Sequence, residues 1–179
     1  QRQMCIRDRL ARVAVATSGP EREAARDALY TMRAPDVDAA IIEALAAAKG
    51  PEQASKRAEL IRAIGERNIK SAVAPLLEAA ADADSRVRTE AWKVLRHLAG
   101  PDQLGTMLEL LMGVESGTER TQAERAVAAV CGRLDPVQAV DRLVARLEGA
   151  PAAGRASLVT LLGQFGGPKA FEAVRAALD

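Results

Sequence analysis

Aromatic side chains are scarce in this sequence. They make up 2% of its 179 residues, and they are Tyr30, Trp92, Phe165 and Phe171. Because so few aromatic residues are present, the core must be built from Ala, Leu, Val and Ile. Small aliphatic side chains of this kind are typical of helices that pack closely, and alanine has the highest helix propensity.

Histidine and cysteine are also rare. Two cysteines, Cys5 and Cys131, cannot form a disulfide framework. Cys131 ends the apolar helical segment 126–131, which predicts a buried and inert thiol. The single histidine, His97, lies late in a predicted helix, where it interacts favourably with the helix dipole. It has no partners in the sequence pattern for a zinc site or for a nucleophile activated by a base.

The sequence has no excess charge of either sign and no long apolar run. Lysine and arginine number 25 against 24 aspartates and glutamates, a net charge of +1, which argues against nucleic acid or an anionic membrane as a partner. No apolar run approaches the roughly 18 residues that span a bilayer. No charged-then-apolar leader with a cleavage site is recognisable either. These features do not assign the protein to a cellular compartment.

What the chain does have is helical periodicity. From Leu10 onward, apolar residues recur at helical spacing in short blocks, and no stretch alternates with a period of two. Four Gly-Pro pairs separate blocks: Gly19-Pro20, Gly50-Pro51, Gly100-Pro101 and Gly167-Pro168. Each predicts a left-handed helix stop followed by a residue suited to a first helical turn. The sequence therefore predicts an all-α fold.

The helical blocks repeat in two interleaved series. One consists of arginines early in the second helix of a pair, at separations of 31, 31, 37 and 30 residues: Arg26, Arg57, Arg88, Arg125 and Arg155. An apolar pair follows each of them: 29–30, 60–61, 91–92, 128–129 and 158–159. The other series marks the first helices with apolar doublets that begin at Ile41, Leu76, Met107 and Leu143, and with a departing match at Val174-Arg175. Two series of nearly one period indicate stacked helical hairpins.

This periodicity predicts the following helix pairs: 36–49 with 51–66, 69–82 with 84–99, 101–114 with 118–133, and 136–148 with 151–164. Leu10–Thr17 with 20–32 stands before them, and a lone helix at 168–178 follows. Residues 10–179 are thus expected to form one right-handed α-solenoid of about five helix pairs. Because neither end carries a polar capping helix, we expect this array to be truncated at both ends.

One segment carries a family resemblance. Residues 72–79, followed by Asp82, Asp84, Val87-Arg88, Ala91 and Leu95, resemble HEAT repeats, particularly the short, Ala-rich bacterial kind described alongside phycobilisome-lyase-like repeats. The resemblance implies a superhelix with the second helices along its inner surface. It also implies an arginine that pairs with an aspartate at the neighbouring turn, and a first helix kinked at Pro75. Tetratricopeptide repeats need more aromatics, and the ankyrin Thr-Pro-Leu-His turn is absent.

Two other stretches resemble known sequences. Residues 1–9 have no helical period and resemble a translated sequencing adapter, with a genuine disordered N-terminus as the alternative. Residues 124–131 are similar to HEAT segments of large multidomain bacterial proteins, in which the array is fused to sugar-hydrolase-like or cytochrome-type modules.

The charged residues have structural interpretations beside functional ones. Asp82, Asp84 and Glu90 lack the spacing and central glycine of an EF-hand, and Asp84 is predicted to be a helix N-cap. The repeated arginines are expected to hold repeats in register, although they could instead form a ligand-binding ladder. The basic run alternates with Glu52, Glu59 and Glu66, as on a solvated helix face; it consists of Lys56, Arg57, Arg62, Arg67 and Lys70.

No residue set in the sequence predicts chemistry. Gly163-x-x-Gly166-Gly167 is a helix end rather than a phosphate loop, because no strand precedes it. We therefore predict no catalytic, cofactor-binding or metal-binding residues and no small-molecule substrate. The predicted function is a non-catalytic scaffold that binds a protein partner along the inner surface of the superhelix. The alternatives are a solenoid that binds the nucleic-acid backbone and an accessory repeat domain of a fused enzyme.

Overall fold

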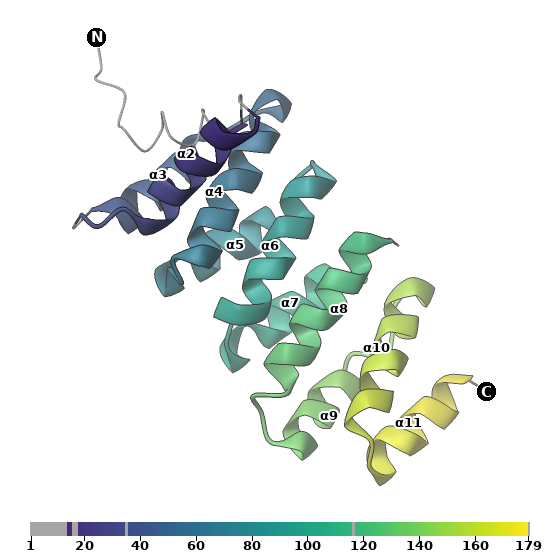
Figure 1. Cartoon of the computed structure of the whole chain (residues 1–179). Helices are drawn as coiled ribbons and strands as arrows, with labels where there is room; N and C mark the ends of the chain where they lie inside the picture. The colour runs from purple at the N-terminus through teal and green to yellow at the C-terminus, as the bar shows by residue number, and fades with distance from the viewer. Residues whose placement is uncertain (1–13, 16–17, 35, 116, 179) are drawn as a thin grey trace. The chain divides into compact units, whose positions relative to one another are not determined.

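The computed structural model describes residues 14–15, 18–34, 36–115 and 117–178 (Figure 1). Within these residues the regular secondary structure is helical, with no strand. The chain forms two compact units, Gln1–Leu98 and Ala99–Asp179. The prediction of an all-α solenoid built from helix pairs is confirmed. Residues 1–9 and most of the helix expected at Leu10–Thr17 lie outside the described residues.

The first unit contains two complete helix pairs, α3 with α4 and α5 with α6, and the second helices α2, α4 and α6 follow one another across it. Single 3-10 turns lead directly into α4 and α5. The bounds are α2 (Pro20–Thr31), α3 (Val37–Ala47), η1 (Pro51–Gln53), α4 (Ala54–Glu66), η2 (Lys70–Ala72), α5 (Val73–Ala79) and α6 (Ser85–Leu98).

The second unit repeats this plan. Helices α7 and α8 form one pair, α9 and α10 form another, and α11 packs on α10 and α9. The bounds are η3 (Pro101–Gln103), α7 (Leu104–Met112), α8 (Thr118–Cys131), α9 (Pro136–Val144), α10 (Ala152–Phe165) and α11 (Pro168–Leu178).

The core of both units is made by the two predicted series. The first residue of each complete first-helix doublet is fully buried, namely Ile41, Leu76, Met107 and Leu143. The second helices bury positions i, i+3, i+4, i+7 and i+8 of one stripe, such as 87, 90, 91, 94 and 95 on α6. Each large aliphatic side chain buried in this way contributes about 1.5–3 kcal/mol.

The predicted register was wrong on α8. Its buried stripe is 123, 126, 127, 130 and 131, so Arg125 is exposed and Glu124 occupies the position that Arg88 has on α6. Ala128 and Ala129, expected in the core, are half-buried. The cause is composition: alanine is small enough to lie on either face, so an alanine-rich helix does not reveal its phase.

Three local expectations also differ from the structure. Pro75 lies in the first turn of α5, where its missing N–H has no intrahelical acceptor, so no kink inside the helix is needed. Gly100 is extended at φ −110°, whereas Gly19 and Gly50 have φ of 64° and 85°. Helix α9 ends at Val144 instead of 148, because the chain continues in tighter turns with i to i+3 bonds.

Helices α4 and α6 approach closely at Gly65. A Cβ atom at this position would lie 2.8 Å from Cγ2 of Val94, which is too short for two carbon atoms. The absent side chain therefore permits the contact between the two second helices.

Candidate functional site

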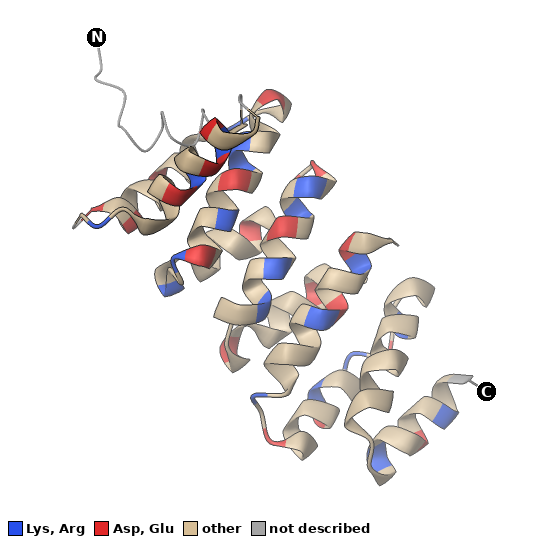
Figure 2. Ribbon diagram, viewed as in Figure 1, with Lys and Arg blue, Asp and Glu red and all other residues tan. Residues whose placement is uncertain are grey.

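A hollow lies over the second helices of the first unit. Its volume is about 370 Å³, and helical spacing brings its lining from α2, α4 and α6. We call this hollow the second-helix groove; its charged and hydroxyl lining consists of Arg22, Arg26, Ser55, Glu59, Arg62, Ser85, Arg86, Thr89 and Glu90. Figure 2 shows basic and acidic bands alternating along α4 and α6, while α10 is almost entirely uncharged.

Glu59 is the centre of the groove's hydrogen bonding. The residue is 1% exposed, and its carboxylate accepts from Arg26 Nε and Nη2 at 2.7 Å each, from the Tyr30 hydroxyl at 2.9 Å and from Arg62 Nη1 at 3.1 Å. Burial alone would raise the pKa of Glu59, but the hydrogen bonds from Arg26 and Tyr30 and the charges of both arginines hold it below its ordinary value. The same burial, with the hydrogen bond to Glu59, raises the pKa of Tyr30.

The ion pairs continue onto α6. Arg62 also donates to Glu90 at 3.1 Å, and Lys93 Nζ lies 2.8 Å from the same carboxylate oxygen. Burial would raise the pKa of Glu90, but these two cations lower it. We call Arg26, Glu59, Arg62, Glu90 and Lys93 the charge ladder; it links α2, α4 and α6 through their side chains.

Arg57 belongs to the core side of α4 and not to the groove. It is 9% exposed, its Nε lies 2.8 Å from Asp82 Oδ2, and its Nη2 donates to Oδ1 at 2.9 Å. The Nε–H is poorly aligned, so that contact is an ion pair rather than a directed hydrogen bond. Nη1 donates to the Gly50 carbonyl at 2.7 Å. The pairing of an arginine with an aspartate at the neighbouring turn is therefore confirmed at Arg57.

This geometry agrees with the comparison to known proteins. Residues 52–128, from η1 into α8, match the family model of HEAT repeats. Residues 52–128 belong to the HEAT repeat family. No curated protein matches the sequence. Among solved structures, the chain is similar to the crystal structure of an engineered protein, with 18% sequence identity and a TM-score of 0.51 over 97% of this chain and 85% of that chain. That likeness shows the fold alone.

The other repeated arginines do not form one ladder. Arg26 pairs with Glu59 instead of an aspartate, and Arg88 donates to the Asp82 carbonyl at 2.8 Å, close to the start of its own helix. Arg125 and Arg155 are exposed. With Arg57, the series predicted from the sequence thus places its members in four different environments.

Only part of the basic run around α4 is a solvated face, since Lys70 is exposed but Arg57, Arg62 and Arg67 make directed contacts. Arg67 donates to the carbonyls of Tyr30 and Met32 at 3.0 and 2.9 Å and pairs with Asp38 at 2.7 Å, so it caps the C-terminus of α2. Arg57 and Arg62 also bond across the HEAT repeats, as described above. The sequence pattern suggested pairs within one helix, and Arg62 does contact Glu59 of its own helix, but Arg62 and Arg67 also have partners on neighbouring helices.

A buried polar cluster in the second unit was missed from the sequence. Ser157 is 1% exposed and accepts from Arg120 Nη1 at 2.6 Å, while its hydroxyl donates to Glu124 at 2.5 Å. Arg120 also donates to the carbonyls of Val114, Glu115 and Ala153. One signal in the sequence could have revealed this cluster. Ser157 lies in the buried stripe of α10, at the same position that Glu90 has in the stripe of α6.

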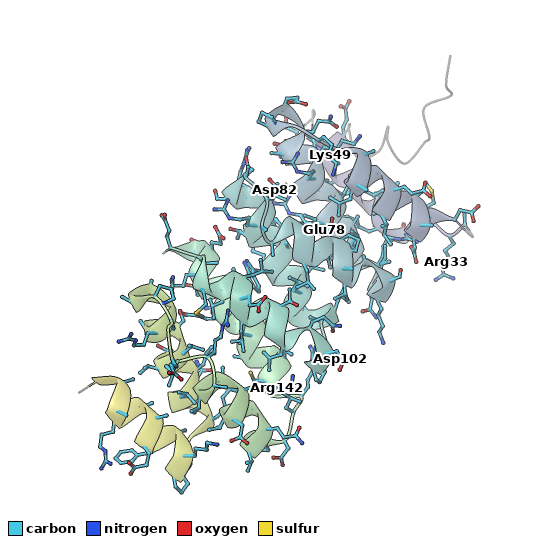
Figure 3. All side chains as sticks on the ribbon, turned by 180° about the vertical axis from the view of Figure 1, so that it is seen from behind. Arg33, Lys49, Glu78, Asp82, Asp102 and Arg142 are labelled. Carbon is cyan, nitrogen blue, oxygen red and sulfur yellow. The ribbon has the colours of Figure 1, made fainter. Side chains whose placement is uncertain are left out.

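Two further hollows lie between first helices, one in each unit. Figure 3 labels Lys49, Glu78 and Asp82, which line the first, and Arg142, which lines the second. The first has a volume of about 780 Å³ and an apolar floor that includes Leu45 and Pro75, with Lys49, Glu78 and Asp82 around it. The second has a volume of about 380 Å³ and lies between α7 and α9, beside Glu109 and Arg142.

The remaining candidates have structural roles. Asp84 caps α6 by accepting from the Arg86 N–H at 2.9 Å, as predicted, and the ion pair with the Arg86 side chain contributes to lowering its pKa to about 2. Cys131 is fully buried, which raises its pKa to about 11. His97 is exposed in the last turn of α6. Gly166, at φ 66°, follows the end of α10 as predicted.

Three or more metal-ligating side chains do not gather at any place in the described part of the chain. In the same residues, every helix is too short or too polar to cross a bilayer.

Proposed function

We propose that this chain is a protein-interaction scaffold that holds a protein partner in its second-helix groove. HEAT repeats are commonly protein-interaction scaffolds. The observation that carries the proposal is the second-helix groove, because it combines a hollow with side chains held at fixed positions by the charge ladder. A preorganised surface of this kind loses little conformational entropy when a partner binds.

The electrostatics of the groove favour binding over proton transfer. Glu59 and Glu90 have lowered pKa values because cations surround them, so both stay ionised at neutral pH. A general acid or base works best with a pKa near the operating pH. Cys131 is buried with a raised pKa, which disfavours the thiolate that a nucleophile needs.

A nucleic-acid backbone is a poorer match than a protein. Binding to phosphates needs a surface with predominantly basic side chains. Within the charge ladder, each arginine and lysine contacts a glutamate, so the ladder itself offers paired charges instead of a cationic track.

The test fills the groove without touching the core. Ser55 is an exposed residue of α4 that lines the groove, and Ser55→Trp would occupy the hollow. Ser71→Trp is the matched control, because Ser71 is equally small and exposed but lies on η2, outside the groove lining. Wild type and both variants would be used as bait in lysate of the source organism, with retained proteins quantified by mass spectrometry.

We expect at least one protein that wild type and Ser71→Trp retain and Ser55→Trp loses. Thermal melts would check that all three proteins are equally folded. If the two variants retain the same proteins, the second-helix groove is not the interaction surface. If wild type retains nothing specific, the scaffold proposal itself is contradicted.

A further inference from the structure

The second-helix groove carries more positive than negative charge. Its lining includes four arginines, Arg22, Arg26, Arg62 and Arg86, and two carboxylates, Glu59 and Glu90. From outside the lining, Lys93 pairs with Glu90 and Asp84 pairs with Arg86. The whole chain, in contrast, is nearly balanced at +1.

The carboxylates of the groove are already neutralised, whereas part of the guanidinium surface faces water. Glu59 has a side chain 2% exposed and is shared by Arg26 and Arg62. The side chains of Arg62 and Arg86 are 40% and 67% exposed. An arginine presents five N–H donors in a planar fork, so one that already contacts a carboxylate can still bind a second one.

Three of the four arginines that line the groove come from three successive helices: Arg22 from α2, Arg62 from α4 and Arg86 from α6. Packed helices are about 8–10 Å apart. A peptide in the extended polyproline II conformation advances about 3.1 Å per residue with three residues per turn, so every third side chain points to the same side. Carboxylates three residues apart along such a segment would therefore reach neighbouring helices.

We infer that the second-helix groove binds an extended segment of the partner protein that carries acidic side chains about every third residue. Arg22, Arg62 and Arg86 pair with the carboxylates of that segment, and the charge ladder holds Arg62 in place between Glu59 and Glu90. This inference rests on the proposed function and adds the chemistry of the partner.

The test uses a peptide of about seven residues with glutamate at the first, fourth and seventh positions and glycine or serine between them. The peptide carries tetramethylrhodamine, and binding to the full chain is followed by fluorescence anisotropy. Peptides with glutamine or lysine in place of glutamate are the specificity controls. A DNA oligonucleotide of equal charge tests the alternative partner class.

The variants remove one charge each. Arg22→Gln and Arg86→Gln change the groove, while Arg125→Gln removes an exposed arginine of α8 that is not part of the groove lining. Since exposed ion pairs are weak, we expect each groove variant to raise Kd about threefold and the double variant about tenfold. Arg125→Gln should leave Kd unchanged. An increase from about 0.05 to 0.5 M salt should weaken binding severalfold.

Several outcomes would overturn the inference. One is no saturable binding of the glutamate peptide, and another is equal binding of the glutamine or lysine peptide. An unchanged Kd in the double variant would also show that Arg22 and Arg86 do not contribute to peptide binding. If DNA binds more tightly than the peptide and loses affinity in the same variants, the groove recognises nucleic acid. If the peptide fails but Ser55→Trp still loses a partner, only the acidic-segment inference fails and the scaffold function stands.

Discussion

Replacing Glu59 with glutamine tests whether the charge ladder stabilises the first unit. Glutamine has the same shape, but its neutral amide can accept fewer of the bonds that Arg26, Tyr30 and Arg62 donate to the carboxylate. Removing one partner of a buried ion pair costs about 3–5 kcal/mol. Because the side chains of Arg26 and Arg62 are 31% and 40% exposed, water will solvate them partly in the variant. We therefore expect a loss of about 2 kcal/mol at neutral pH.

The loss should depend on pH. The pKa of Glu59 is lowered in the fold, so its ionised form contributes stability above the ordinary glutamate pKa of about 4.3. That contribution disappears as the pH falls through the lower value in the folded protein, because wild-type Glu59 then also becomes neutral. The difference between wild type and Glu59→Gln should consequently shrink in acid.

Urea unfolding followed by tryptophan fluorescence measures this effect in the right unit. Trp92 is the single tryptophan, and it is fully buried in α6 of the first unit. Glu66→Gln is the matched control, since Glu66 is an exposed residue at the end of the same helix. Equal midpoints for the two variants at pH 7 would refute the reasoning. A Glu59→Gln loss that is as large below pH 4 as at pH 7 would show that packing, not charge, is responsible.

Three further predictions follow from burial and packing. Gly65→Ala should destabilise the first unit by about 1–2 kcal/mol in urea unfolding, because its Cβ meets a rigid valine, whereas Gly163→Ala, with open space around it, should stabilise α10 by about 0.5–1 kcal/mol. In a Cys5→Ser background, Cys131 should resist iodoacetamide at pH 8.5 until denaturant is added, and stability should fall as the pH rises from about 9 toward 11; rapid labelling of the folded protein would contradict its burial. Ser157→Ala should lower the free energy of unfolding of the second unit by about 1–2 kcal/mol, because Glu124 loses its donor. The loss should appear in calorimetry as a lower melting temperature, and an unchanged melting temperature would contradict this role.

Much of the fold was predictable because it depends on local spacing. Helical periodicity identified which residues of α3, α4, α6 and α10 face the core. The prediction failed on α8, where alanines on both faces removed the contrast that periodicity needs. It also misread Pro75, because a 3-10 turn directly before a short helix cannot be distinguished in sequence from one longer helix.

The candidate site was much less predictable. Glu59 looked like one member of a solvated helix face, yet it is among the most buried charged residues of the described chain. Its partner Arg26 is 33 positions away, and Arg62 reaches Glu90 across 28 positions. Spacing along one helix shows neither that such residues are buried against a neighbouring helix nor which partner they meet.

The amino-acid sequence by itself determined the helices, their pairing and, outside the alanine-rich α8, the apolar stripes, because these depend on residues three and four positions apart. The tertiary structure alone decided how far each helix is shifted along its neighbour. That shift selects Glu59 and not another carboxylate for Arg26, and it hollows the face between α2 and α6. Side-chain packing across helices sets this shift, and such packing depends on all the contacting residues together.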